Sequence, residues 1–367
     1  MKFTIFGLSI SSSWGNGHAT PYRAILKALH GQGHQITFFE KDVPYYARHR
    51  DLAYPNFCKL VLYSDWSEIR TEALRESGES DVALCASYCP EGAEIIDDVL
   101  DLPRPLKLFY DLDTPVTLAA LERGKVECLR ASQMPEFDLY LSFTGGGTLD
   151  ELTSHWGVQR AAALYGCVDP DAHRSIAPRA EFMCDLSYMA TYAPDRQQKV
   201  SKLLLSPAAK LPSRKFVLAG SMYPAAMKWP NNVSHFEHVA PTEHSALYSS
   251  SRLTLNVTRG DMSRWGYCPS GRLFEAAACG TPLISDWFEG LDTFFDPTAG
   301  EIVIAHEDND VIAAIELSDE ELARMARRAR ERTLSEHTGE QRARELVSAI
   351  EQVASHSDVE RARSEVA

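Results

Sequence analysis

The sequence predicts an α/β protein with two Rossmann-like domains, whose parallel sheets face each other across a cleft. Three observations support this fold class. Short apolar segments alternate with amphipathic helical segments along most of the chain. The alternation lapses once, over residues 166–180, in a stretch rich in Asp, Pro and Ala, and then restarts. A chain of 367 residues exceeds the usual size of one core, and two domains of roughly 150 to 200 residues fit it well.

The first block opens with a βαβ unit, the building block of a parallel sheet. Residues 2–10 form a short apolar strand, and a helix follows that has Ile25, Leu26 and Leu29 on one face. The next strand covers residues 35–40. Further elements of this block are expected as strands over 59–62, 81–86, 106–110, 139–143 and 161–165 and as a helix over 91–100.

The second block repeats this architecture without repeating the sequence. Its elements are expected as strands over 186–190, 215–219, 253–257, 282–285 and 301–304 and as helices over 195–205, 242–249 and 270–279. Near the C-terminus, Ser318 with Glu321 and Thr338 with Gln341 have capping-box spacing, which predicts two further helices. The resulting organisation is a first domain over 1–168, a second over 180–337, a last helix over 338–355 and a tail over 356–367.

The composition limits the partners that the protein binds. The formal net charge is −14 and is spread along the chain, so neither nucleic acid nor a membrane surface is an expected partner. The N-terminus lacks the features of a signal peptide, and no apolar stretch approaches a membrane span. The eight cysteines form no C-x-x-C pair and are expected to be reduced. A cytoplasmic location is therefore predicted.

The most informative segment is the helix expected over 270–279. Pro269 and Ser270 can begin it, and Gly280 can end it in the left-handed conformation. The helix is apolar or small on every face except at Glu275, so this carboxylate is predicted to be buried and to need a partner. Two explanations remain open: an ion pair with Arg272 one turn earlier, or a ligand with a vicinal diol, such as a ribose.

The same segment resembles the signature of retaining two-Rossmann glycosyltransferases, E-x7-E followed by A-x-A-C-G-x-P-x-I. Residues 275–284, EAAACGTPLI, match its second half. The sequence resembles most closely the CgeB-like family, often labelled spore maturation protein. The resemblance also rests on LNVTRGDM (255–262), SDWFEGLD (285–292), EHT (336–338) and, less specifically, WGNGHAT (14–20).

This resemblance implies transfer of a sugar from a nucleotide-diphosphate sugar, with Glu275 binding the ribose diol and with a last helix that crosses back to the first domain. It also implies retention of configuration. The chain departs from the signature at one position, because Tyr267 stands where the first Glu is expected. That Glu contacts the transferred sugar in the family. Tyr267 either offers its hydroxyl there or packs.

The first domain carries the predicted acceptor side. The loop with Gly15, Asn16 and Gly17 lies between a strand and a helix N-terminus, where backbone N–H groups favour an anion. A tight turn explains the glycines equally well. His18 at the helix entrance is a candidate proton acceptor, and Asp111 at a strand end is a candidate for acceptor recognition. Asp113, ahead of Pro115, is predicted to be an N-cap.

The second domain carries the predicted donor side. Glu275 and Arg272 are joined there by Arg196, whose charge can neutralise a diphosphate, although most arginines are solvated surface groups. Backbone and small side chains at strand ends and at the helix start complete the predicted set: Thr191, Gly220, Ser221, Ser270 and Gly271. No cluster has the sequence spacing of a metal site, so neither a metal nor another cofactor is expected.

The predicted activity is glycosyl transfer to an acceptor that the sequence does not identify. Two alternatives belong to other classes. One is another enzyme of similar fold, a nucleotide-sugar epimerase or a dehydrogenase, although the missing G-x-G-x-x-G argues against the dehydrogenase. The other is a non-catalytic protein that binds a nucleotide or a carbohydrate, a hypothesis that rests on Tyr267.

Overall fold

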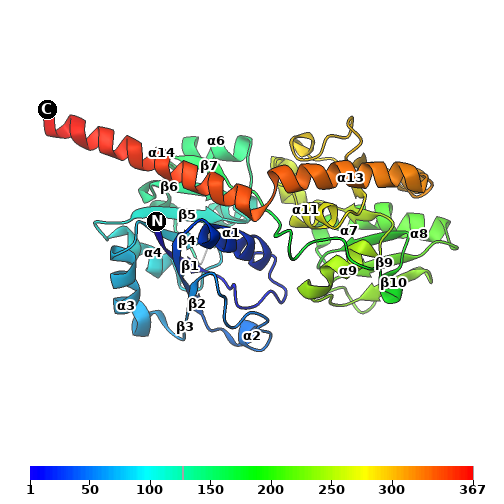
Figure 1. Cartoon of the computed structure of the whole chain (residues 1–367), viewed down its shortest axis with the longest axis horizontal. Coiled ribbons are helices and arrows are strands. Elements are labelled where there is room, and N and C mark those ends of the chain that lie inside the picture. Colours follow the sequence, from blue (N-terminus) through cyan, green and yellow to red (C-terminus); the bar gives the residue numbers. More distant parts are fainter. Residues whose placement is uncertain (126–127, 367) are drawn as a thin grey trace. The chain divides into compact units, whose positions relative to one another are not determined.

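The computed structural model describes residues 1–125 and 128–366, of which residues 357–366 are described by their backbone alone. The chain forms two compact units (Figure 1). The first consists of Met1–Tyr165 together with Gly339–Ala367, and the second of Gly166–Thr338. The second unit is therefore an insertion between two parts of the first. Ala367, the end of the predicted tail, lies outside the described residues.

The first unit is built on a seven-stranded sheet in the order β3-β2-β1-β4-β5-β6-β7, and every pairing in it is parallel. The strand order reverses between β1 and β4, which is where sheets of this type bind ligands. The central strand β1 aligns Phe3 with Ile36 of β2 and with Val82 of β4. The strands are β1 (Lys2–Gly7), β2 (Gln35–Lys41), β3 (Lys59–Tyr63), β4 (Val82–Ala86), β5 (Leu106–Asp111), β6 (Leu139–Ser142) and β7 (Ala161–Ala163).

Helices connect these strands, and all but the four-residue helix bury part of their surface. They are α1 (Ala19–Gly31), α2 (Pro44–Ala47), α3 (Trp66–Gly78), α4 (Gly92–Leu100), α5 (Thr114–Glu122) and α6 (Gly147–Ser154), with a 3-10 turn at Ala131–Glu136. The last helix, α14 (Gly339–Val366), packs against α1 (Figure 1). At Gly339 a Cβ atom would lie 2.4 Å from the carbonyl oxygen of Ala24, so the close approach of the two helices requires glycine.

The second unit is built on a six-stranded parallel sheet in the order β10-β9-β8-β11-β12-β13. Its strands are β8 (Leu186–Met189), β9 (Phe216–Ala219), β10 (Val233–Phe236), β11 (Thr254–Asn256), β12 (Leu283–Ser285) and β13 (Val303–Ile304). Its helices are α7 (Pro194–Val200), α8 (Ser206–Lys210), α9 (His244–Ser249), α10 (Gly260–Trp265), α11 (Gly271–Ala278), α12 (Asp308–Ile315) and α13 (Asp319–Glu336). Short 3-10 turns lie at Ala180–Phe182, Pro241–Glu243 and Leu291–Thr293.

Helix α11 shows how local sequence sets local structure. The residues from Leu273 to Ala278 are all buried, as the apolar composition predicts. Gly280 follows the helix with φ +79°, and the amides of Gly280 and Thr281 donate to the carbonyls of Ala277 and Ala276. This is a Schellman ending, for which glycine is the preferred residue.

The predicted fold class is confirmed, since both units are Rossmann-like α/β units with parallel sheets. The differences are local. The helix expected over 195–205 is interrupted after Val200 by a π-helical turn, Ser201–Leu205, before α8 begins. Strand β10 was not expected from the sequence. It lies at the sheet edge, where two of its four side chains are exposed and no apolar run marks it.

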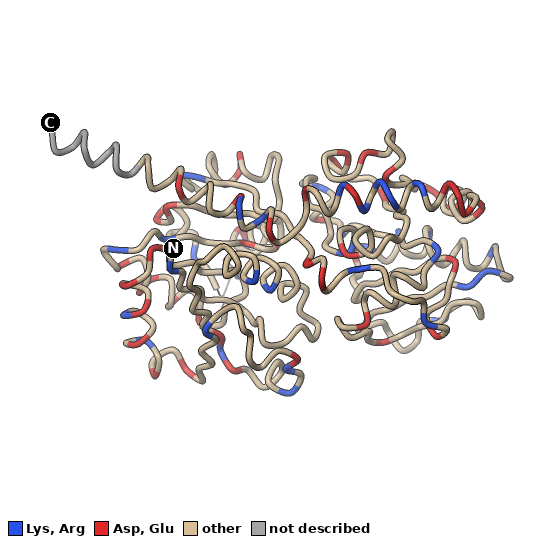
Figure 2. Tube along the Cα trace, viewed as in Figure 1, with Lys and Arg blue, Asp and Glu red and all other residues tan. Residues whose placement is uncertain are grey.

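Acidic and basic residues are interspersed along both units (Figure 2). Helix α13 carries both signs, and one turn apart on it Arg324 pairs with Glu320 and Arg332 with Glu336. The capping box at the start of α13 is present, because Glu321 accepts from the amide and the hydroxyl of Ser318. Among the described residues, no helix combines the length and the apolarity that crossing a bilayer requires.

Candidate functional site

Two arginines lie at the carboxyl edge of the second sheet. Arg196 of α7 donates to the carbonyl of Thr191, just beyond β8. Arg272 of α11 donates from Nε to the carbonyl of Met189, 2.8 Å away, and from Nη1 to Oδ1 of Asn256, 2.7 Å away. Backbone and amide oxygens thus hold both guanidinium groups at the end of the sheet where ligands bind in this architecture.

Neither guanidinium has a counter-charge among the residues that the structure describes. Within the described part of the chain, no carboxylate lies at ion-pair distance from Arg196 or Arg272, whereas the nearby Arg259 pairs with Asp195 at 3.3 Å. Arg196 is only 7 % exposed, and its Nε has no hydrogen-bond partner in the described part of the chain. Burial, together with the charges of Arg272 and Arg259, lowers the pKa of Arg196. Buried positive charge without compensation is costly, which points to an anionic ligand.

The N-terminus of α11 adds to this positive field. Its N-cap residue Ser270 is extended, and the Ser270 side chain makes no capping hydrogen bond. Gly271 leaves the first turn open, since no neighbour lies closer than 3.8 Å to the position of a Cβ atom there. The amides of a helix N-terminus favour phosphate oxygens. The predicted residues Arg272, Ser270 and Gly271 therefore belong to one short segment.

The strand ends on the other side of Arg196 are held by close backbone contacts. A Cβ atom at Gly220 would lie 1.9 Å from the carbonyl oxygen of Ala190, so only glycine fits between β8 and β9. The amide of Tyr192 donates to the carbonyl of Ser221 at 2.9 Å. Thr191 is exposed beside this crossing. The structure thus brings the predicted Thr191, Gly220 and Ser221 to one place.

Glu275 is buried, as predicted, with 8 % of its surface exposed. Its Oε2 lies 3.6 Å from Nδ1 of His244 and 3.5 Å from the hydroxyl of Tyr248. Both of these residues belong to α9. The ion pair with Arg272 that the sequence left open is not formed, because Arg272 points to Met189 and Asn256 instead.

Glu275 stays ionised near neutral pH. Burial would raise its pKa, but the close approach of His244 and the charges of His173, His244 and Arg272 outweigh burial and lower the pKa to about 2. His173 and His244 were not predicted as site residues. They are distant from Glu275 in sequence, and no local pattern marks them.

Tyr267 has an unusual backbone and a packed ring. Its φ of 44° is rare for a residue with a side chain. Its amide donates to the carbonyl of Glu289 at 2.6 Å, and its ring fills the space beside Gly290. Packing therefore accounts for the ring position of Tyr267.

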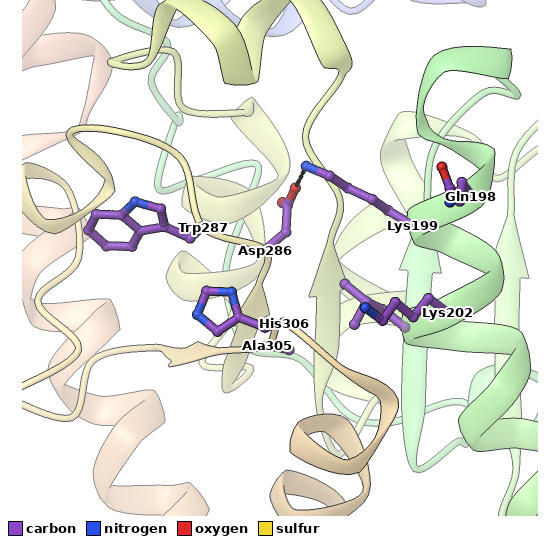
Figure 3. Close-up of a pocket in the computed structure, with 8 residues that line it drawn as sticks. Gln198, Lys199, Lys202, Asp286, Trp287, Ala305 and His306 are labelled. Atoms are coloured by element: carbon purple, nitrogen blue, oxygen red, sulfur yellow. Dashed lines mark hydrogen bonds and ion pairs between the residues drawn. The ribbon is translucent and has the colours of Figure 1, made fainter.

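A cavity of about 260 Å³ lies beside α7, beyond the ends of β12 and β13 (Figure 3). Its lining includes Lys199, Asp286 and Trp287, and Lys199 Nζ lies 2.6 Å from Asp286 Oδ2. Asp286 Oδ1 accepts from the amide and the hydroxyl of Thr258, each at 2.9 Å. None of the residues that line this cavity belongs to the predicted donor set.

In the first unit, the glycine-containing loop after β1 is tied down by Glu40. This fully buried carboxylate accepts from the hydroxyls of Ser9 and Ser11 and from the amides of Ile10 and Ser11. Asn16, also buried, donates to the carbonyls of Ser9 and Ser12, and its oxygen accepts from the amide of His18. Asn16 thus holds the loop and the amide of His18 in place.

The side chain of His18 faces an acidic group. His18 follows β1, and its Nε2 lies 3.4 Å from Oδ2 of Asp113, which follows β5. The ring of Tyr88, from the end of β4, lies edge-on at 5.2 Å from His18. Strands β1 and β4 flank the reversal of strand order, the ligand-binding position of such a sheet, and β5 lies next to β4.

Asp113 corrects one expectation. It occupies the N-cap position of α5, but its side chain makes no capping hydrogen bond. It approaches His18 instead, and Pro115 in the first turn removes one amide that a cap would serve. Asp113 is therefore the carboxylate of a His–Asp pair.

Asp111 is fully buried and uses both oxygens within the protein. Oδ2 accepts from the hydroxyl of Tyr140 at 2.8 Å, and Oδ1 accepts from the Thr117 hydroxyl at 2.9 Å and the Asp113 amide at 3.1 Å. Burial raises the pKa of Asp111 to about 6, against these hydrogen bonds. Its position suits it to orient Asp113 rather than to contact an acceptor.

Comparisons with known proteins agree with this architecture. Residues 196–348 match a family model described as glycosyl transferase-like. The match begins at Arg196 and includes α11 with Arg272 and Glu275. No functionally curated protein matches the sequence.

Solved structures match over nearly the whole chain. An alpha-glucosyltransferase (AGT) in complex with UDP is 14 % identical, with a TM-score of 0.74 over 95 % of this chain and 99 % of that chain. Sucrose-phosphate synthase from Thermosynechococcus elongatus is 12 % identical, with a TM-score of 0.67 over 97 % and 100 %. Anabaena HepE in complex with UDP and glucose is 10 % identical, with a TM-score of 0.64 over 96 % and 100 %. The fold is that of GT-B glycosyltransferases. At these identities the likeness shows the fold alone.

Proposed function

We propose that the protein is a glycosyltransferase that takes a sugar from a uridine-diphosphate sugar, and that it belongs to the CgeB-like branch. The observation that carries this proposal is the pair Arg196 and Arg272, two guanidinium groups at the carboxyl edge of the second sheet that no described carboxylate neutralises. A diphosphate supplies the missing negative charge. The family match over residues 196–348 and the GT-B fold support the same assignment, and uridine is chosen because the matched AGT and HepE structures contain UDP.

The proposed chemistry follows from these groups. Transfer breaks the bond between the anomeric carbon and an oxygen of the β-phosphate, so negative charge builds up on the departing diphosphate. Arg196, Arg272 and the amides at the start of α11 are placed to stabilise that charge. Glu275 is the proposed ribose ligand. Its Oε1 lies near the first turn of α11, close to Gly271, while Oε2 faces α9.

On the acceptor side we propose His18 as the group that receives the proton of the acceptor hydroxyl. Asp113 holds the imidazole and stabilises its charged form. Asp111 is a positioning residue, because it accepts from the amide of Asp113. The resemblance to a retaining family makes retention of configuration the expected outcome.

The test combines binding with turnover. UDP, GDP, dTDP and their glucose conjugates are added to the full chain in a thermal-shift panel, where a ligand at about 100 times its dissociation constant adds about 2.7 kcal/mol. Selective stabilisation by UDP and release of UDP from UDP-glucose support the proposal. Stabilisation without release indicates a binding protein, and interconversion of the bound sugar without release indicates an epimerase. Stabilisation by none of the nucleotides contradicts the proposal.

A further inference from the structure

Three side chains that commonly bind metals meet on the buried side of α11. His173 lies in the segment before β8, His244 is the first residue of α9, and Glu275 belongs to α11. One ligand atom of each lies within 4.8 Å of those of the other two. All three residues belong to the second unit. Folding alone creates this cluster, since its members come from separate segments.

Neighbouring contacts hold the two histidines together. Ser245, next to His244, donates from its hydroxyl to the carbonyl of Ala172 at 2.8 Å and accepts from the amide of Arg174 at 3.3 Å. These contacts clamp the residues on both sides of His173. The two imidazole rings consequently lie 6.4 Å apart between their centroids. The ligand atoms are therefore preorganised rather than brought together by chance on a mobile surface.

The cluster leaves ring nitrogens unused. His173 is 5 % exposed, and its Nδ1 has no hydrogen-bond partner among the described residues. Nδ1 of His244 also lacks a hydrogen bond and lies 3.6 Å from Oε2 of Glu275. A buried polar atom without a partner costs roughly 1–3 kcal/mol, so two of them beside a carboxylate require an explanation. A cation bound between them provides one.

We propose that His173, His244 and Glu275 bind a divalent transition metal, with Zn²⁺ as the expected occupant. Two imidazole nitrogens and one carboxylate oxygen, with the fourth position open, form a ligand set that Zn²⁺ uses, whereas Ca²⁺ and Mg²⁺ prefer oxygen ligands throughout. Ligand atoms around tetrahedral Zn²⁺ lie about 3.3 Å apart, as follows from Zn–N distances of about 2.0–2.1 Å. The 3.6 Å between His244 and Glu275 is already close to this value.

A metal at this site also determines the orientation of the Glu275 carboxylate. A metal bound through Oε2, which faces His244, leaves Oε1 directed toward the first turn of α11. The metal thereby fixes the orientation of the carboxylate that we propose as the ribose ligand.

The test uses the full chain, freed of metal by a chelator and titrated with Co²⁺ in the absence of nucleotide. We expect one equivalent to bind, with the visible absorption of four-coordinate cobalt, and Zn²⁺ to displace it. His173→Ala and His244→Ala should each weaken binding by about 100-fold or more, because even outer-shell changes cost 10–100-fold. His306→Ala is the matched control. This exposed histidine of the same unit lies outside the cluster, so its loss should leave the titration unchanged.

Binding that survives both cluster variants, or the absence of a stoichiometric Co²⁺ signal, overturns the site. X-ray absorption of the Zn²⁺-loaded unaltered chain gives a second answer that does not depend on whether the variants fold. Two imidazoles and a carboxylate oxygen support the proposal, and sulfur ligands overturn it. Nucleotide binding is measured separately on the metal-free chain, so failure of the metal site and failure of the proposed function remain distinguishable.

Discussion

At the carboxyl edge of the first sheet, buried carboxylates are surrounded by donors, whereas at the same edge of the second sheet the buried Arg196 and the half-buried Arg272 pair with no described carboxylate. Glu40 and Asp111 accept several hydrogen bonds each from their own unit. Arg196 and Arg272 contact neutral oxygens, so no described carboxylate offsets their charge. The difference separates two uses of buried charge: a satisfied group stabilises its loop, and an unsatisfied group is available to a ligand.

The largest expected effect concerns the His18–Asp113 pair. His18→Ala should slow transfer by roughly 10²–10⁴-fold, the usual contribution of a general base, while the affinity for the nucleotide stays the same. Turnover and UDP affinity are measured on the same variant. His155→Ala, which removes an exposed histidine of the same unit, is the control. Loss of UDP binding in a folded His18→Ala protein would show that the donor contacts the first unit at this residue.

A substitution of Asp111 tests whether the buried carboxylates at the carboxyl edge of the first sheet serve stability rather than ligand binding. Its pKa of about 6 in the folded protein exceeds the ordinary value of 3.8, so its contribution to stability is full below pH 3.8 and is lost as the pH rises through 6. The shift corresponds to about 3 kcal/mol. The unfolding free energy of the unaltered protein should therefore fall between pH 4 and 7. In Asp111→Asn this fall should be smaller, and denaturant titration at several pH values measures the difference. Parallel pH profiles of the two proteins contradict this assignment.

A substitution of Arg272 tests whether the arginines at the carboxyl edge of the second sheet bind a diphosphate. Arg272→Ala should weaken UDP binding roughly 30-fold, because a charge-assisted hydrogen bond contributes about 1.5–3 kcal/mol. The melting temperature should change little, since an uncompensated charge is removed together with its contacts. Arg214→Ala, which removes a partly exposed arginine paired with Asp185 and Glu316, should leave UDP affinity unchanged. Equal effects of the two substitutions would contradict the diphosphate assignment.

The smallest effect is expected at Glu275, because one of its oxygens faces helix α9 and only the other is proposed to contact the ligand. Glu275→Gln should weaken UDP binding by about tenfold in the metal-free chain, because Gln keeps the shape but loses the charge that strengthens hydrogen bonds to the ribose. The unfolding free energy should be nearly unchanged. Calorimetric titration and thermal melting of the same variant are compared. A destabilised variant with full affinity indicates that Glu275 serves its contacts with α9 alone.

The sequence-based predictions that the structure confirms rest on patterns of residues that are close together in the sequence. The positive φ at Gly280 and the Ser318–Glu321 box follow from residues a few positions apart, and the alternation of apolar segments was sufficient for the fold class. Contacts between residues that are distant in the sequence could not be predicted from it. His173 and His244 approach Glu275 only after folding. The side chain of Asp113 contacts His18, which comes from another strand of the sheet, instead of capping its helix. The assigned roles of the site residues stay predictions.

The insertion of one unit into the other has a consequence for synthesis on the ribosome. Helix α1 is translated before the second unit, but α14, which packs against it, is translated only after that unit. Roughly 300 residues lie between them, so at about 5–20 residues per second the apolar face of α1 waits tens of seconds for this partner. The second unit, Gly166–Thr338, is continuous and is complete before α14 is made. In ribosome-bound chains that end at Thr338, we expect the second unit to resist protease while the first remains sensitive.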